Sequence, residues 1–240
     1  HWEALYHIDV ARQMSEARLE YVGSATISDN VIALTAPPEV AAMLPSGDPA
    51  MAETIKDFAV NRQFRRDLYV RGPVRLTGQQ FVHELGAVRF TLTIAAERTS
   101  LTLMTSAGEL KSNAPLVEPL LARLKQGSAS FAELAALPPL SGMQPWQVAQ
   151  ALSLLVESGQ IHPLLDSGEA EPQSAQALNA TLLEAARHDE SMQFLAAPAI
   201  GSGVYVANAE QLVLLAMKNV GTSDDVAALA RFVWPIFKAQ

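Results

Sequence analysis

The 240-residue sequence contains no cysteine, which excludes disulfides, thiolate metal sites and a cysteine nucleophile together. No apolar run approaches the roughly 20 residues that a membrane-spanning helix needs. The first ten residues, HWEALYHIDV, contain no initiator methionine, no basic leader and no apolar signal segment, so we expect no signal peptide and a chain cut from a longer one. Together these absences predict a soluble, cytoplasmic protein.

Positive charge is also scarce outside one segment. The formal net charge is −8, which argues against nonspecific nucleic-acid binding by the whole chain. Residues 61–98 hold seven arginines against three carboxylates, whereas residues 1–60 and 99–240 each carry a net charge of −6. This basic segment between acidic flanks favours ion pairing within the chain.

Hydrophobic residues are plentiful at 49%, enough for one large core or two small ones. In the first half, apolar spacing predicts helices over 2–18 and 48–64, and TAPPEV and LPSGDP should break the chain. Strands are expected at 19–27 and 66–72, and the stretch 87–95 should pair with 100–108 through the polar turn AERTS. The first half is therefore expected to be α+β, with helices on a small mixed or antiparallel sheet.

The second half is mainly helical. A helix is expected at 115–125, and Ser130 with Glu133 forms a capping-box pattern. The next helix should present Trp146, Ala149, Leu152 and Leu155–Val156 on one face, end at Gly159 and lead into a short strand. This order of helix, short helix, longer helix and strand is that of a winged helix.

The acidic connector DSGEAEPQSAQ (166–176) should be loose. Beyond it we expect a helix over 177–188, a hairpin over 193–208 and two final helices. The predicted domains are a regulatory-like domain at 1–112 and a winged-helix-like domain at 113–240.

Motifs that carry chemistry are weak. AIGSGVYV offers Gly201 and Gly203 to a nucleotide, but it lacks the third glycine and strand-like residues follow it, so a hairpin turn is favoured. HELG at His83 is half of a zinc motif, and Ser202 lacks the flanks of a nucleophile elbow. We expect no catalytic, cofactor-binding or metal-binding residue in this chain.

The expected recognition helix of the winged-helix pattern is poorly suited to DNA. It offers Gln147 and Gln150 but no arginine or lysine, and its one charge, Glu157, repels phosphate. A protein-contact or structural role is therefore favoured, and no nucleic-acid partner is expected.

The run NRQFRRDLYVRG (61–72) is the most distinctive stretch. Arginine pairs with carboxylates through two donors at once and tolerates partial burial when paired. A strand would place Arg66, Leu68, Val70 and Gly72 on one face and Asp67, Tyr69 and Arg71 on the other. Both a structural ion-pair network and a surface for an anionic ligand or acidic partner fit this pattern. The candidate regulatory or interface residues are Arg62, Arg65, Arg66, Tyr69 and Arg71.

Two stretches, W.ALY..DVA..MSEARLEYVGSA and ETIKDFAVNRQFRRDLYVRG, resemble the predicted methyltransferase regulatory domain. That domain follows the catalytic S-adenosylmethionine (SAM) domain in bacterial methyltransferases, including some that act on protein lysines. The later FAELA...W.V..AL..LVESGQIHPL and FLAAPAIGSGV resemble the winged-helix-like C-terminal portion of the same enzymes.

The resemblance implies a non-catalytic regulatory or substrate-recognition region of a SAM-dependent methyltransferase. It also implies an upstream catalytic domain that holds the SAM, because no SAM-binding domain is present here; a protein substrate and a second copy of the chain are further candidate partners. The alternative is a stand-alone interaction module or an atypical winged-helix transcription regulator. A SAM-binding domain encoded upstream of His1 would distinguish the two.

Overall fold

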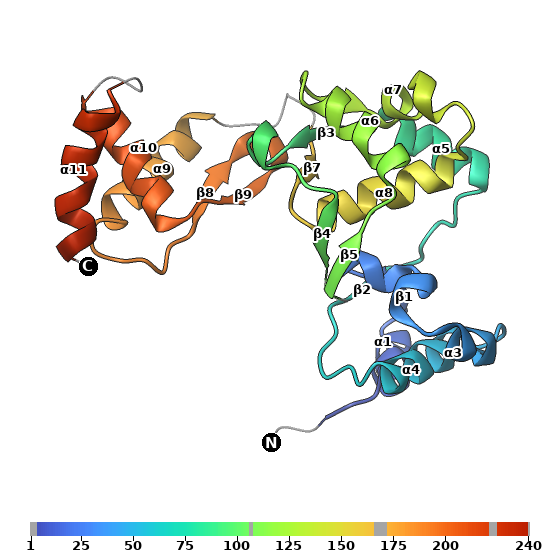
Figure 1. Ribbon diagram of the computed structural model, residues 1–240. Helices are drawn as coiled ribbons and strands as arrows, with labels where there is room; N and C mark the ends of the chain where they lie inside the picture. The colour runs from blue at the N-terminus through green and yellow to red at the C-terminus, as the bar shows by residue number, and fades with distance from the viewer. Residues whose placement is uncertain (1–3, 106–107, 166–171, 221–224, 240) are drawn as a thin grey trace. The chain divides into compact units, whose positions relative to one another are not determined.

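The computed structural model describes residues 4–105, 108–165, 172–220 and 225–239. The chain forms two compact units, His1–His162 and Pro163–Gln240 (Figure 1). Helices and small antiparallel sheets make up both, which confirms the expected α+β class. The predicted division between residues 112 and 113 lies inside the first of these units and stays a prediction.

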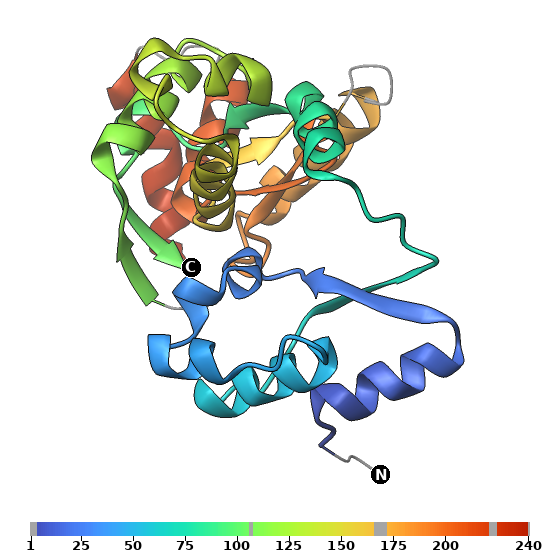
Figure 2. The ribbon, with the colours of Figure 1, turned by 90° about the vertical axis from the view of Figure 1, so that its right-hand side faces the viewer.

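The first part of unit 1 contains one two-stranded sheet and several helices. Its strands β1 (Leu19–Ser24) and β2 (Asp67–Arg71) are antiparallel, with Tyr21 opposite Tyr69 and a bulge before Gly23. Its helices are α1 (His7–Glu16), the 3-10 helix η1 (Ile27–Asn30), α2 (Ile32–Thr35), α3 (Pro38–Met43) and α4 (Pro49–Ala59). Figure 2 shows α1 and α4 on the same side of β1.

The ends of α4 determine where the arginine-rich run begins. Asp48 caps its N-terminus by accepting a hydrogen bond from the Met51 N–H at 3.0 Å, as the sequence indicates. The helix ends at Ala59, short of the expected residue 64, and Asn61 adopts a left-handed φ of 49°. This turn sends residues 62–66 back towards β2. The break expected at TAPPEV is found between α2 and α3, and Pro38 of that stretch already occupies the first turn of α3, where its missing N–H costs nothing.

Among its described residues, the second part of unit 1 contains four α-helices, two short 3-10 helices and two small sheets. Its helices are α5 (Gly78–Ala87), the short η2 (Ala96–Arg98), α6 (Ala114–Leu124), α7 (Phe131–Ala135), the short η3 (Pro138–Leu140) and α8 (Pro145–Glu157). Strands β3 (Arg89–Leu92), β6 (Ala129–Ser130) and β7 (Ile161–Pro163) form a sheet in the order β6-β3-β7, and β4 (Thr102–Thr105) pairs with β5 (Gly108–Lys111). The order α6, α7, α8, β7 is the expected one, and the winged-helix assignment itself stays a prediction.

The expected hairpin between 87–95 and 100–108 is wrong. Phe90 pairs with Ala129 of β6 and is only 5% exposed, so β3 is drawn into the core. The backbone N–H of Thr93 donates to the Gln160 carbonyl, and that of Ser100 donates to the buried Gln160 side chain. The segment AERTS (96–100) is therefore anchored to Gln160, the residue before β7, and contains η2 rather than a hairpin turn.

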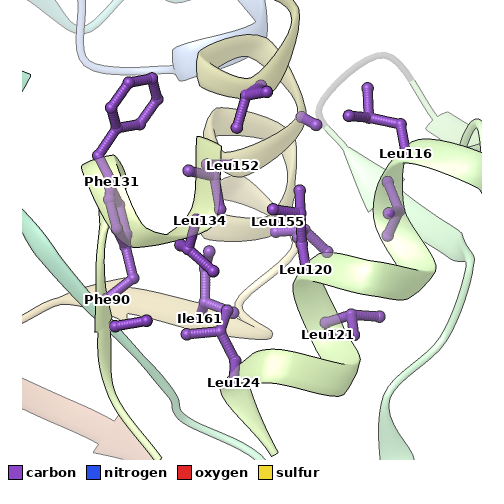
Figure 3. Packing of buried hydrophobic residues seen from close by; sticks show 14 of the residues in the cluster. Phe90, Leu116, Leu120, Leu121, Leu124, Phe131, Leu134, Leu152, Leu155 and Ile161 are labelled. Atoms are coloured by element: carbon purple, nitrogen blue, oxygen red, sulfur yellow. The ribbon is translucent and has the colours of Figure 1, made fainter. Parts of the chain in front are cut away.

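The core of unit 1 lies between α6, α7, α8 and β3 (Figure 3). Leu120, Leu134 and Leu155 are completely buried there. The expected inner face of α8 is right for Leu152 and Leu155 but wrong for Trp146, which is 63% exposed. The buried positions follow i, i+3, i+4, i+7 from Val148, a stripe that leaves Trp146 outside it.

Hydrogen bonds between η1 and α8 join the two parts of unit 1. The Ser28 hydroxyl in η1 donates to Glu157 Oε1 at the end of α8 at 2.8 Å, and the Ser28 backbone N–H donates to the other carboxylate oxygen. The charge-assisted pair fixes η1 against α8. Glu157 thus has a structural partner.

In its described residues, unit 2 consists of a β-hairpin and three α-helices. They are α9 (Pro172–Ala185), α10 (Asn208–Val220) and α11 (Val226–Ala239), and strands β8 (Phe194–Ala197) and β9 (Ser202–Tyr205) form the expected hairpin around η4 (Pro198–Ile200). Gly201 is left-handed at φ 61°, and a Cβ there would lie 2.4 Å from Leu165 Cδ1. The left-handed turn and the close approach of Leu165 account for a glycine at position 201, so no bound ligand is needed to explain it. Of the connector expected to be loose, residues 166–171 lie outside the described residues, and 172–176 begin α9.

In the part of the chain that the structure describes, every helix falls short of the length and apolar character required to cross a membrane.

The inner face of α8 can be tested by a pair of substitutions. We expect Leu155→Ala to lower the free energy of unfolding by about 2–5 kcal/mol, because it leaves a cavity among fully buried side chains. Trp146→Ala should change it by about 1 kcal/mol or less, since that ring is mostly exposed. Urea unfolding of both variants measures the difference. A larger loss of stability for Trp146→Ala than for Leu155→Ala would show that α8 packs its other face against the core.

Candidate functional site

Arg65 lies at the centre of a cluster of carboxylates. Its Nη1 is 2.6 Å from Asp57 Oδ1, its Nε is 2.9 Å from Asp67 Oδ2, and its Nη2 is 2.8 Å from Glu53 Oε2. The same Nη2 donates to the Tyr21 hydroxyl at 3.1 Å. All three edges of the guanidinium are therefore used, which is the geometry that distinguishes arginine from lysine.

Helical spacing brings the α4 members of this cluster together. Glu53 and Asp57 are four residues apart and so lie on one face of the helix. Lys56 is on the neighbouring row, with Nζ 2.6 Å from Glu53 Oε1 and 2.9 Å from the Asp29 carbonyl. The Lys56 residue is only 2% exposed, so its charge is compensated inside the protein.

Arg62 extends the cluster to η1. Its Nη2 is 2.6 Å from Asp29 Oδ1, and its Nε lies 3.6 Å from Asp57 Oδ1. Asp29 is 5% exposed. The pair therefore fixes η1 to the loop that follows α4.

His7 joins α1 to the same cluster. Its Nδ1 is 3.0 Å from Asp67 Oδ2, and its ring meets Tyr21 edge to face at 4.7 Å. The His7 side chain is fully buried, and among the described residues its Nε2 has no hydrogen-bond partner. Next to it, the Ile8 backbone N–H donates to the Thr54 hydroxyl of α4 at 3.1 Å, so the start of α1 is bound twice.

Burial and ion pairing shift the acidities of the cluster in opposite directions. Burial opposes ionisation of Asp67, but hydrogen bonds from His7 and Arg65 outweigh it and lower the Asp67 pKa. The pKa of Glu53 is lowered in the same way by Lys56 and Arg65, against the effect of burial. For Asp57, burial prevails over its arginine partners and raises the pKa.

The other predicted residues divide between the cluster and the surface. Tyr69 stacks edge to face on Tyr21 at 5.9 Å, and its buried hydroxyl has no hydrogen-bond partner among the described residues. Arg66 donates to the Thr26 hydroxyl at 3.0 Å, and Arg71 makes an exposed 3.4 Å contact with the Ala17 carbonyl. The structure thus unites Arg62, Arg65 and Tyr69 but leaves Arg66 and Arg71 outside the cluster.

The predicted alternation of β2 places its polar face inward. Asp67 and Tyr69 point towards α1 and α4, whereas Leu68 and Val70 are 50% and 44% exposed. Val22 of β1 is also about half exposed, so the outer face of the sheet carries three exposed apolar side chains beside the exposed Glu20, which is opposite Val70.

A cavity of about 530 Å³ lies beside the cluster, lined by α1, the end of α4, residues 61–65 and β2. Asp57, Asp67, Arg62 and Arg65 contribute its charged lining, two carboxylates and two guanidinium groups. Tyr6, Phe58 and Phe64 also line it, and they are 59%, 65% and 80% exposed. The site therefore combines an ionic inner lining with exposed aromatic rings.

Sequence reasoning alone did not identify His7, Glu53, Asp57 or the exposed aromatic rings. The four-residue spacing of Glu53 and Asp57 just before the arginine run is the signal that could have indicated them. Across the described ranges, histidine and carboxylate side chains form no group of three that could hold a metal ion.

Residues 1–71 match the family model of the predicted methyltransferase regulatory domain. This stretch holds α1 to β2 and the whole charged cluster. The full chain is 30% identical to an uncharacterized protein of Synechocystis sp. and covers 47% of it.

The fold is similar to that of PKMT2 from Rickettsia typhi, solved in complex with AdoHcy, with a TM-score of 0.53, 11% identity and coverage of 98% of this chain and 50% of that one. This likeness shows the fold alone. The chain thus spans about half the length of the proteins it matches, and its first 71 residues are similar to a methyltransferase-associated regulatory domain.

The structural role of Arg65 can be measured against Arg71. Arg65→Ala removes one cationic partner from each of three partly buried carboxylates at once, so we expect it to destabilise the first part of unit 1 by about 3 kcal/mol or more. Arg71→Ala removes an exposed contact and should cost about 0.5 kcal/mol or less. Urea unfolding followed through the amide NMR signals of β1 and β2 reports both. Equal, small losses would show that the network contributes little to stability.

Proposed function

We propose that this chain is a non-catalytic regulatory and substrate-recognition region of a SAM-dependent methyltransferase that acts on protein lysines. The observation that carries the proposal is the family-model match over residues 1–71, which contains every residue of the Arg65 cluster. Catalysis and SAM binding belong, on this proposal, to a further domain of the same protein.

The arrangement of the arginines supports a structural use of the run. Arg62 and Arg65 are engaged by Asp29, Asp57 and Asp67 at 2.6–2.9 Å, so an external anion would have to displace existing partners. The run therefore fixes the relation of α1, η1, α4 and β2. A regulatory domain needs such a fixed shape to present a constant surface to its partner.

The glycine pair of the sequence supports the non-catalytic assignment. Gly201 and Gly203 belong to the turn and second strand of the β8–β9 hairpin, in which Ala196 is opposite Gly203. A nucleotide site of the dinucleotide-binding type places its glycines between a strand and a helix N-terminus. This hairpin lacks that geometry.

The outer face of the β1–β2 sheet is suited to contact a catalytic domain. Val22, Leu68 and Val70 are 47%, 50% and 44% exposed on two paired strands, in which Glu20 is opposite Val70 and Gly23 is opposite Leu68. Contiguous exposed apolar side chains mark contact surfaces, and a two-stranded sheet needs further packing for stability. Relatives about twice as long as this chain have room for such a domain.

The proposal predicts a division of activities. By isothermal calorimetry the 240-residue chain alone should not bind SAM, and it should transfer no methyl group, whereas the longer protein that contains it should do both. Micromolar binding of SAM to the 240-residue chain would contradict the proposal.

Within the longer protein, Leu68→Asp should lower methyl transfer about tenfold, the effect of losing roughly 1.4 kcal/mol of contact. Met43→Asp is the matched control, because Met43 is 74% exposed at the end of α3, away from this face. Equal activity of the two variants would show that the outer face of the sheet does not contact the catalytic domain.

A further inference from the structure

We propose that the free edge of β9 pairs with the same edge of a second copy of this chain, so that two β8–β9 hairpins form one four-stranded antiparallel sheet. The contact lies within unit 2 and is independent of the proposed function. Three features of the hairpin carry it: the direction of its backbone hydrogen-bonding groups, the glycine at position 203 and the lack of charge along both strands.

One edge of the hairpin, on β8, is closed. Ala196 lies opposite Gly203, and its backbone N–H donates to the Asn179 side-chain oxygen at 2.7 Å. The Asn179 side-chain nitrogen donates to the Ala196 carbonyl at 2.9 Å. A side chain of α9 thus takes the place of a neighbouring strand on the outer side of β8. An edge that is covered in this way cannot pair with another strand.

The other edge, on β9, is open. In an antiparallel pair of strands, hydrogen-bonded and non-hydrogen-bonded residue pairs alternate. The Val206 backbone N–H donates to the Gln193 carbonyl at 2.9 Å, which fixes this alternation along the hairpin. Gly203 and Tyr205 consequently fall in non-hydrogen-bonded pairs, and their N–H and C=O groups point away from β8. Among the described residues, no other element supplies a hydrogen-bond partner to these groups.

The open edge is complementary to itself. If two β9 strands run antiparallel with their Val204 residues opposite each other, Gly203 of each copy lies opposite Tyr205 of the other. Both outward-facing residues then enter hydrogen-bonded pairs, in which each N–H and each C=O finds a partner. A two-fold axis between the two Val204 residues makes the halves of the contact identical, and this is the commonest symmetry of homodimers.

This register accounts for Gly203. Its backbone belongs to a strand and has no positive φ, and an added Cβ would lie 3.4 Å from Phe194 Cβ, an ordinary contact. The hairpin alone therefore does not require a glycine. A glycine inside a strand often marks a place where another chain approaches closely, and an aromatic ring on the neighbouring strand compensates for its missing side chain. In the proposed sheet the Tyr205 ring of the second copy covers Gly203.

Two exposed rings set the size of the contact. Phe194 and Tyr205 are 60% and 57% exposed, lie opposite each other and meet edge to face at 5.8 Å. Side chains of this size leave roughly 200–300 Å² of ring surface uncovered in each copy. With four residues of strand, the contact stays below the roughly 1,200 Å² at which standard interfaces begin. We therefore expect a weak dimer whose population depends on protein concentration.

The absence of charge favours a second copy over a charged partner. Residues 191–209, which contain both strands, include no aspartate, glutamate, lysine or arginine, in a chain whose net charge is −8. Two copies of this stretch can therefore meet without repulsion between like charges. The strand also has no lysine, proline or bulge, the features that commonly protect a free edge from pairing.

Disulfide formation between copies tests the register. The chain has no cysteine, so a single introduced cysteine can form a disulfide only with a second copy. In the proposed sheet the two Val204 Cα atoms are about 4.5 Å apart, a separation that a disulfide can bridge. Ser202→Cys is the matched control on the same face of the strand, because its two Cα atoms would be four residues apart, about 14 Å.

Under mild oxidation we expect Val204→Cys to form the covalent dimer at least about tenfold faster than Ser202→Cys, as followed by gel electrophoresis without reductant. Ser202 is exposed and Val204 only partly so, which means that random collisions between copies would give the opposite order. Equal rates, or faster cross-linking of Ser202→Cys, would overturn the proposal.

Sedimentation equilibrium measures the dimer without a covalent bond. The 240-residue chain should change from monomer to dimer between about 10 μM and about 1 mM. Gly203→Pro should weaken dimerisation about tenfold, because it removes an outward N–H that makes no bond within the hairpin, so the fold should persist. Trp234→Ala, which removes a ring that is 59% exposed on α11 of the same unit, is the matched control and should dimerise as the unaltered chain does.

Two results of this measurement would contradict the pairing of β9. A chain that stays monomeric up to about 1 mM has no such contact. A dimer that is lost in Trp234→Ala and kept in Gly203→Pro is held by α11 instead of β9.

Discussion

The guanidinium of Arg65 is placed among carboxylates from α4 and β2, and the first part of the molecule depends on this placement. Through Asp67 it reaches His7 and the start of α1, and through Asp57 it reaches Arg62 and η1. A single planar cation with donors on three edges can connect elements that are distant in sequence. The conformation of the arginine run is thus dictated by charge compensation.

The interior of this part is unusually polar. Among the described residues before Phe90, eight polar or charged residues are at most 9% exposed. Ala36 is the one hydrophobic residue among them that is buried to the same extent. The eight polar or charged residues are His7, Ser24, Thr26, Ser28, Asp29, Thr35, Thr54 and Lys56. Buried polar groups of this kind stabilise a fold only when their partners are present, so removal of one partner costs more than the pair contributes. In this part polar side chains are buried, whereas the apolar side chains of Val22, Leu68 and Val70 are exposed on the outer face of the β1–β2 sheet.

Much of the fold could be predicted from the sequence, because local signals determine single elements. Asp48, Ser130 and Gly201 each act within a few residues, and the elements they delimit form as expected. Contacts between residues that are distant in sequence could not be predicted. The pairing of β3 with β6 depends on burial of Phe90, and the exposure of Trp146 depends on which stripe of α8 meets α6 and α7.

The candidate site shows the same limit. The arginine run is visible in the sequence as a set of cations, and ion pairing within an acidic chain is a reasonable expectation. Which arginine pairs with which carboxylate depends on the turn at Asn61 and on the return of the chain to β2. The position of His7 depends on a contact between residues 60 positions apart, and no local pattern encodes it.

The central claim is that Arg65 and its carboxylates act as one coupled unit, and a double-mutant cycle tests it most directly. The variants are Arg65→Met, Asp67→Asn and their combination, with stability measured by urea unfolding through the NMR signals of β1 and β2. The account predicts a coupling energy of about 1.5–3 kcal/mol, as for groups in one hydrogen-bonded network. Effects that add within about 0.5 kcal/mol would contradict it, because the two side chains would then stabilise the fold independently.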